Sequence, residues 1–159
     1  MDLLPFFQWM GSIPLSTYVL GHTWPAPIVQ VIHLVAVAVF VGALIVVDMR
    51  LLGRGFTARP LADVARDAQP WLIGAFILLF ITGLPSLTST ALKQYYSPFF
   101  WWKMEALLLG VIFTFTVRRK IIQSDEARLG SVWPKVVGIM SIAIWTSVTI
   151  GARLIGLMG

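Results

Sequence analysis

Four long apolar stretches constrain the fold of this chain more than any other feature. A helix that crosses a bilayer needs about 20 mostly apolar residues to cover roughly 30 Å of hydrocarbon. The chain has 159 residues, 58% of them hydrophobic, which leaves almost no room for a soluble domain. We therefore predict one domain over residues 1–159, an all-α integral membrane four-helix bundle. The predicted spans are Pro25–Met49, Pro70–Thr88, Pro98–Val117 and Val132–Leu157.

The basic residues predict how the helices are oriented. They cluster in the connections between spans one and two and between spans three and four, whereas residues 1–32 contain no Lys or Arg. The positive-inside rule places both clusters in the cytoplasm, and both termini then lie outside, in the periplasm. We expect a multi-pass protein of the inner (plasma) membrane that contacts the lipid bilayer and no nucleic acid. The clusters are Arg50, Arg54, Arg59 and Arg66, and Arg118, Arg119, Lys120, Arg128 and Lys135.

The segment 3–20 is apolar but does not resemble a cleaved signal peptide, because it lacks a basic start and contains Pro5 and Pro14. We expect a broken helix on the outer membrane interface. It either anchors the bundle or forms a lid over an outward-facing site. Its predicted lipid-facing residues are Phe6, Phe7 and Trp9.

Three nitrogen-bearing side chains are predicted to converge at one depth in the outer part of the bundle. His33 lies about eight residues into span one, Lys103 five residues into span three, and Arg153 one turn before the end of span four. At about 1.5 Å per residue this is roughly 7–12 Å below the interface. An ionisable residue inside a membrane costs roughly 2.5–3.5 kcal/mol and marks a functional site by default. The alternatives are that Lys103 and Arg153 extend to headgroups and that His33 is a packing histidine.

Helical spacing suggests the walls of a pocket around these residues. Ser141, Trp145, Thr149 and Arg153 recur every four residues and are expected to form one stripe on span four. Thr82 lies on span two beside Pro85, which is expected to kink that helix. His22 either folds over the pocket or lies in a loop. The predicted site residues are His33, Thr82, Lys103, Trp145 and Arg153, with His33 and His22 as candidate metal ligands.

Other charged residues allow further expectations. Asp48 and Arg50 are expected to form a structural ion network with neighbouring loops or with Arg118 and Arg119. Residues 59–69 suggest a short surface helix ahead of Pro70, with Asp63 and Asp67 on one face. Glu105, two residues after Lys103, points away from it, toward another helix, a partner subunit or the headgroups.

Three segments resemble a small bacterial four-helix membrane family of unknown function. They are IHLVAVAVFVGALIVVDMRLLG (Ile32–Gly53), PFFWWKMEALLLG (Pro98–Gly110) and WTSVTIGARLIG (Trp145–Gly156). The pattern is more distantly similar to the membrane protoporphyrinogen oxidase family of the HemJ kind and to the copper-resistance CopD family. The residues that carry the resemblance to the family of unknown function are His33, Asp48, Arg50, Lys103, Gly151 and Arg153.

The first of the distant resemblances implies haem b as cofactor. It implies that His33 is the axial iron ligand and that Lys103 and Arg153 neutralise the haem propionates. The later histidine often found on the third helix of that family is missing here, where the chain reads Thr114-Phe115-Thr116-Val117. The acidic motif of the oxidase is also missing, so porphyrinogen oxidation is not expected. The second axial ligand would be His22, Met104, Met140 or water.

Three functions from different classes follow. The first is a membrane-embedded haem b-binding bundle with an outward-facing site, for electron transfer or redox sensing. The second is a copper-handling protein that uses His22, His33 and methionines, since imidazole and thioether ligands suit copper(I). The third is a non-catalytic subunit that docks a membrane or periplasmic partner. We favour haem, because only haem gives His33, Lys103 and Arg153 distinct roles in one site; enzymatic activity and oligomeric state are left open.

Overall fold

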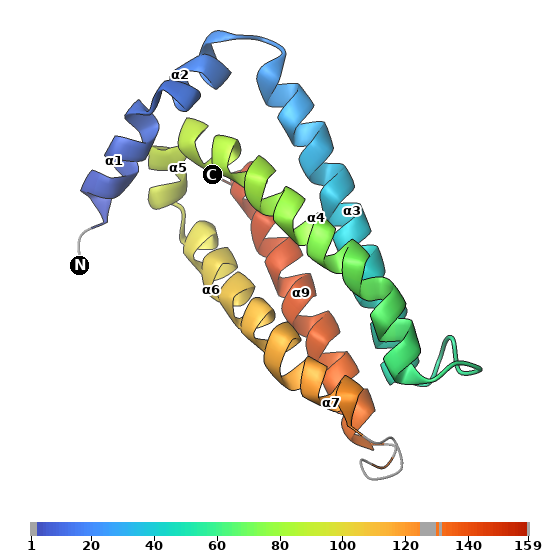
Figure 1. The fold of residues 1–159 in the computed structure, drawn as a ribbon. Helices are drawn as coiled ribbons and strands as arrows, with labels where there is room; N and C mark the ends of the chain where they lie inside the picture. Colours follow the sequence, from blue (N-terminus) through green and yellow to red (C-terminus); the bar gives the residue numbers. More distant parts are fainter. Residues whose placement is uncertain (1–2, 125–129, 131, 159) are drawn as a thin grey trace.

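The computed structural model describes residues 3–124, 130 and 132–158, and within these ranges the chain forms helices and no strand (Figure 1). In this described part, four helical runs are long and apolar enough to cross a membrane. The protein is therefore a multi-pass membrane protein with a helical bundle, as predicted. The runs are α3 (Pro25–Leu51), α4 (Leu61–Ser89), α9 (Val132–Met158) and the run from Pro98 to Gln123, which comprises α6 (Pro98–Phe113), the π-helix η1 (Thr114–Arg118) and α7 (Arg119–Gln123).

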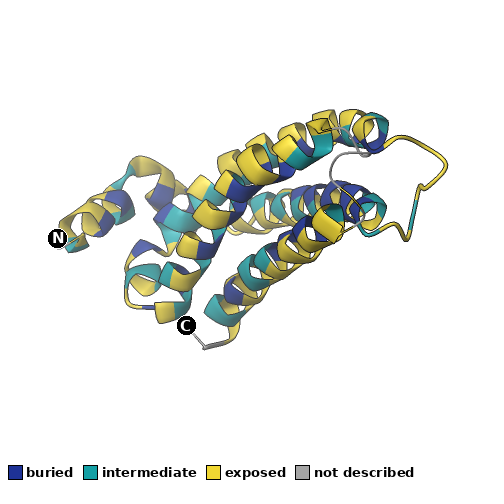
Figure 2. Cartoon of the chain, turned by 90° about the horizontal axis from the view of Figure 1, so that it is seen from below, coloured by how far each residue is buried: buried dark blue, intermediate teal, exposed yellow. Residues whose placement is uncertain are grey.

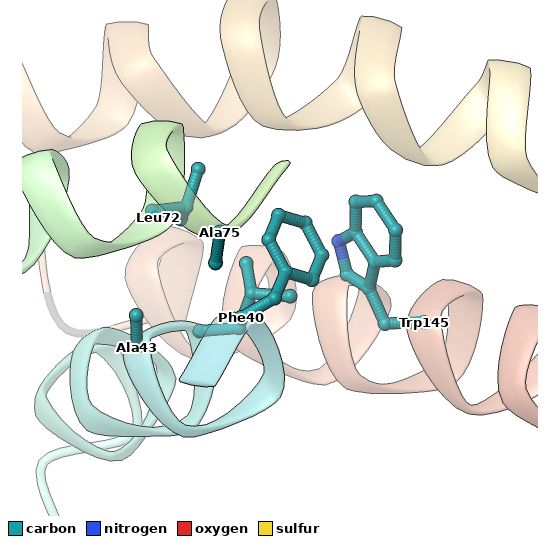
Figure 3. Close-up of a cluster of buried hydrophobic side chains, with 6 residues drawn as sticks. Phe40, Ala43, Leu72, Ala75 and Trp145 are labelled. Atoms are coloured by element: carbon teal, nitrogen blue, oxygen red, sulfur yellow. The ribbon is translucent and has the colours of Figure 1, made fainter. Parts of the chain in front are cut away.

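The spanning helices pack as two pairs. Helix α3 lies along α4, α6 lies along α9, and contacts between α3 and α9 join the pairs (Figure 1). Buried residues follow the inner side of each helix, while most outward residues are exposed (Figure 2). The exposed apolar side chains face lipid in a membrane, where water no longer opposes their exposure. The central core consists of Phe40, Ala43, Leu44, Leu72, Ala75 and Trp145 (Figure 3).

The two ends of the bundle differ. Both termini lie at one end, which we call the termini end; the connection from α3 to α4 and helix α7 lie at the other, which we call the Arg-rich end (Figure 1). Arg50, Arg54, Arg118 and Arg119 lie toward the Arg-rich end, as expected from the sequence, and Arg128 lies outside the described residues. The side of the membrane that each end faces remains a prediction from the charge distribution.

Helix α4 corrects one prediction. The sequence suggested a surface helix over residues 59–69 and a separate span from Pro70, but a single helix begins at Leu61 and continues through Pro70. Leu61, Val64, Ala68 and Leu72 are all buried on one side of it. This apolar stripe crosses Pro70 without interruption, and its packing offsets the backbone hydrogen bond that proline removes. Residues 61–69 are therefore the first part of the long helix α4 and not a separate surface helix.

The N-terminal segment is a broken helix, as predicted. It forms α1 (Leu4–Ser12) and α2 (Pro14–Gly21), separated by Ile13 in an extended conformation, because the residue before a proline disfavours helix. Phe6 and Trp9 are exposed, but Phe7 is 5% exposed, and the prediction that it faces lipid is wrong. Phe7 and Met10, three residues apart, share the side of α1 that packs on Phe100 and on α5 (Ala91–Tyr95).

Candidate functional site

A hydrogen-bonded relay connects α3 and α4 at His33. The Nδ1 atom of His33 lies 2.7 Å from Thr82 Oγ1, and the Thr82 hydroxyl donates to the backbone carbonyl of Leu78 at 2.7 Å. When the Thr82 hydroxyl hydrogen is directed at Leu78, Thr82 accepts a hydrogen bond from His33 Nδ1–H. In that tautomer Nε2 of the neutral imidazole presents a lone pair, the form in which imidazole binds a metal.

His33 is partly buried between α3 and α4, and a groove lies near it. Thr82 is buried, His33 is half-buried, and a Cβ atom added at Gly83 would lie 3.8 Å from His33 Cε1. A groove of about 260 Å³ opens one helical turn nearer the termini end. Gln30 and Ser86 in its lining lie one turn from His33 and Thr82, respectively. The groove, which is lined by residues of α2, α3 and α4 among others, thus begins about one helical turn from His33, and neither His33 nor Thr82 lines it.

Lys103 adds a positive charge near the termini end of the bundle. Its side chain is half-buried, and its Nζ lies 5.7 Å from the ring centroid of Phe100, within the range of a cation–π contact. Its backbone packs directly on α9, since a Cβ added at Gly151 would lie only 3.2 Å from Lys103 Cβ. Lys103 thus lies in the contact between α6 and α9, whereas Thr82 contacts His33 between α3 and α4; the convergence of His33, Lys103 and Arg153 on one site stays a prediction.

Arg153 does not share the inward stripe of α9. Ser141 and Trp145 are buried, but Thr149 and Arg153 are exposed, so the predicted four-residue stripe is wrong for its last two members. The reason is geometric. With 3.6 residues per turn, each four-residue step rotates by about 40°, and three such steps move a side chain from the inner to the outer side of a helix. Gly151 occupies the inward position instead.

Trp145 belongs to the central core and not to the surroundings of His33. Its Nε1 donates to Thr114 Oγ1 at 3.2 Å, and its ring stands edge-on to Phe40 at 4.7 Å between centroids (Figure 3). Phe40 follows His33 by seven residues, or roughly 10 Å along α3. Trp145 and Phe40 therefore form an apolar layer that separates His33 from the Arg-rich end.

His22 lies at the C-terminal end of α2 and has partners of its own. It is exposed, its Nδ1 lies 2.9 Å from the Tyr18 carbonyl oxygen, and its ring is 4.5 Å from the Tyr18 ring. His33, by contrast, lies eight residues into α3, roughly 12 Å along the helix. Within the described residues, no group of three or more His, Asp or Glu side chains is arranged to hold a metal ion.

A second polar cluster lies toward the Arg-rich end. Arg118 Nη2 lies 3.0 Å from Asp48 Oδ1, and the two side chains are only 3% and 2% exposed. Ser141 donates to Asp48 Oδ2 at 2.8 Å, and Arg118 Nη2 donates to the Leu44 carbonyl at 3.1 Å. The predicted pairing of Asp48 with Arg118 is thus confirmed. Arg50 instead donates from Nε to the Arg59 carbonyl.

The π-helix η1 carries buried polar side chains at both of its ends. Thr114 and Arg118 are both buried, and residues four apart lie on one side of a helix. Sequence reasoning missed this turn and missed Ser141 as a partner of Asp48. Nothing in the local composition signals a π-helix, whereas the polar Ser141 in an apolar span was a usable signal.

Comparison with known proteins places the chain in a family. It belongs to a protein family of unknown function, DUF6644, which matches residues 6–158. This agrees with the resemblance to an uncharacterised membrane family that the sequence suggested. No curated protein and no solved structure matches the chain.

Proposed function

We propose that this chain, a member of a family of unknown function, is a membrane-embedded protein that binds haem b through His33. The observation that carries the proposal is the relay from His33 through Thr82 to the Leu78 carbonyl. Metal-binding histidines usually donate their other ring nitrogen to a protein oxygen, which fixes the tautomer and the ring orientation. The contact between His33 Nδ1 and Thr82 Oγ1 has the geometry of this arrangement. Its Nε2 is available as a single axial ligand.

The neighbouring charge also fits haem. Haem carries two carboxylates, and a carboxylate buried in a membrane needs a cation. Lys103, half-buried at the contact between α6 and α9, supports the role of a propionate partner. The exposed side chain of Arg153 gives no comparable support for the second propionate role predicted from the sequence. Of the predicted site residues, His33, Thr82 and Lys103 therefore form the proposed haem-binding set.

The bound haem would supply one-electron redox chemistry, and the residues of this chain would position it. Thr82 orients His33, Lys103 balances negative charge, and the layer of Phe40 and Trp145 closes the site toward the Arg-rich end. The distribution of Arg and Lys supports an outward-facing site in the inner membrane. Electron transfer or redox sensing at the outer side of this membrane is the function that we propose.

Copper handling, suggested by the distant resemblance to the CopD family, is the weaker proposal. His22 and His33 lie on different elements, and His22 contacts Tyr18 of its own helix. Copper(I) sites gather soft ligands around one position. Met104 on α6 and Met140 on α9 are both exposed. Their exposure also weakens the proposal that either methionine is the second axial ligand of haem.

The test is a haem titration of the protein in lipid nanodiscs, followed by its visible spectrum. We expect saturable binding with a Soret band in the wild type and in His22→Ala, and loss of that band in His33→Ala. The matched control is His22→Ala, because it removes the other histidine of the chain. Equal spectra for the two alanine variants would contradict the proposal. Absence of binding in all three proteins, together with a stable co-purifying neighbour, would favour the function of a non-catalytic partner-docking subunit.

A further inference from the structure

A second groove, of about 200 Å³, lies between α3, α4 and the connection that joins them, toward the Arg-rich end. One part of its wall is apolar and includes Ala43 and Val46, two residues of the first span. Another part is an ion pair, in which Nη2 of Arg59 lies 2.8 Å from Oδ2 of Asp67. Its other lining residues are Phe56, Val64 and Ala68. The groove therefore combines a hydrocarbon surface with one positive and one negative charge.

The apolar wall of this groove faces the membrane and not the interior of the bundle. Val46 and Asp48 are two residues apart on α3, so their side chains point about 160° apart around the helix. Asp48 accepts a hydrogen bond from Ser141 of α9. Val46 thus lies on the side of α3 that is turned away from α9, and its side chain is only half-buried there. The hydrocarbon chains of a bilayer therefore have direct access to this wall.

The ion pair and the apolar wall lie at different depths. Helices α3 and α4 are antiparallel and touch where His33 meets Thr82 (Figure 1). Asp67, fifteen residues before Thr82, is therefore about level with residue 48 of α3, and Ala43 lies roughly 8 Å deeper. The 27 residues of α3 span roughly 40 Å, about 10 Å more than the hydrocarbon of a bilayer. With α3 centred in the membrane, Asp67 is at the hydrocarbon boundary and Ala43 lies within the hydrocarbon.

The two charges at this boundary match a zwitterionic headgroup. The side chains of Arg59 and Asp67 are 54% and 55% exposed, so both are accessible to a ligand. A guanidinium has five N–H donors, and its planar fork pairs well with the oxygens of a phosphate. The carboxylate of Asp67 accepts hydrogen bonds and attracts a cation, but it repels a phosphate. A headgroup with both a phosphate and a primary ammonium satisfies both residues.

The backbone of Phe56 is a further indication that the groove holds a ligand. Its φ of 54° lies in the left-handed region, which a bulky residue rarely adopts. Its side chain is 53% exposed, so burial in the protein core does not account for this conformation. Strained backbone of this kind clusters at ligand-binding sites. Here it places an aromatic ring in the wall of the groove, where a lipid would cover it.

We propose that this groove binds a phospholipid whose headgroup carries a phosphate and a primary ammonium, as phosphatidylethanolamine does. Arg59 binds the phosphate, Asp67 binds the ammonium, and a segment of one acyl chain lies against Ala43 and Val46. The volume of about 200 Å³ is smaller than a typical enclosed ligand pocket and suits a chain segment whose remainder stays in the bilayer. The proposal does not depend on haem, because His33 lies roughly 15 Å along α3 from Ala43.

The test is a titration of the protein in detergent with single lipids, followed by native mass spectrometry. The probes are phosphatidylethanolamine, phosphatidylcholine and phosphatidylglycerol with identical acyl chains. We expect phosphatidylethanolamine to bind about three- to fivefold more tightly than the other two, the upper range for exposed charge pairs. The reason is that choline has no N–H to donate and that glycerol brings no cation to Asp67. Equal affinities, or a preference for either competitor, would overturn the proposal.

Two substitutions that each remove one charge assign the preference to the groove. We expect Asp67→Asn to abolish the preference for phosphatidylethanolamine, and Arg59→Gln to weaken the binding of all three lipids about three- to fivefold. The matched controls are Asp63→Asn and Arg66→Gln, because these residues form an exposed pair at 2.9 Å that does not line the groove. Equal losses in the controls, or an unchanged preference in Asp67→Asn, would overturn the assignment.

Glycerophosphoethanolamine, which has the same headgroup and no acyl chains, distinguishes a lipid site from a site for a soluble phosphate compound. We expect that it does not displace bound phosphatidylethanolamine at equal concentration, because it leaves the apolar wall uncovered. Displacement at equal concentration would show that the apolar wall contributes nothing, and it would overturn the lipid site.

Discussion

At the scale of single residues, the hydroxyl of Thr82 is the feature on which the proposed site most depends. Its oxygen lies 2.7 Å from His33 Nδ1 and 2.7 Å from the Leu78 carbonyl oxygen, so one side chain holds the orientation of the imidazole against α4. The sequence placed His33 and Thr82 in one predicted pocket. It did not show that they touch, because the contact depends on the rotation of α3 against α4.

Thr82→Val tests the orienting role with little change in shape. Valine removes both hydrogen bonds, and we expect the affinity for haem to fall about 10- to 100-fold, as for other residues that orient a ligand. The measurement is a haem titration, with Thr149→Val as control because Thr149 is exposed on α9. Unchanged affinity and spectrum in Thr82→Val would show that the hydrogen bond does not orient the ligand.

The buried pair of Asp48 and Arg118 gives a prediction for stability. In Asp48→Ala, Arg118 remains buried as an uncompensated cation, which costs about 3–5 kcal/mol. We expect a large decrease in the free energy of unfolding, measured by denaturation in detergent micelles. The control is Asp63→Ala, which removes an exposed pair with Arg66 that contributes at most about 1 kcal/mol. Similar losses in the two variants would contradict the account of the buried pair.

At the scale of elements, length and hydropathy were sufficient to find the four spans. The details that differ depend on packing, which composition does not contain. Helix α4 passes through Pro70 because its buried stripe continues, and Phe7 turns inward because α5 and α6 offer it an apolar surface. On α9, Trp145 and Gly151 are buried whereas Thr149 and Arg153 are exposed, because successive residues of a helix are rotated by about 100° around its axis.

The contact between α6 and α9 gives a prediction for Gly151. A Cβ atom there would lie 3.2 Å from Lys103 Cβ and 3.5 Å from its Cα, and backbone atoms cannot move aside easily. We expect Gly151→Leu to destabilise the protein by about 1–3 kcal/mol, as overpacking does. Gly156→Leu is the control, since a Cβ at Gly156 would meet nothing within 4 Å. Equal thermal stability of the two variants would show that the close approach of α6 and α9 is dispensable.

At the scale of the whole molecule, the charge distribution predicts the orientation that the coordinates alone leave open. The Arg-rich end should face the cytoplasm and the termini end the outside. A membrane-impermeant thiol reagent applied to intact cells should then label Thr23→Cys and spare Thr57→Cys, two exposed positions at opposite ends of α3. The reverse labelling pattern would contradict both the orientation and an outward-facing site.

The whole molecule also shows which parts of the candidate site could be predicted from the sequence. Depth along a helix follows from counting residues, which is why His33, Lys103 and Arg153 were predicted in one layer. The direction of a side chain around its helix is harder to predict, because a small error in rotation adds up over several turns. The predicted inward position of Arg153 is wrong for this reason, since its side chain is exposed.

The most direct measurement is the visible spectrum of the protein purified from membranes of cells with an ample haem supply, recorded oxidised and after reduction. The account predicts a Soret band, with α and β bands that sharpen on reduction, in the wild type and not in His33→Ala. A wild-type spectrum without visible absorption would contradict the central claim that His33 binds haem in this protein.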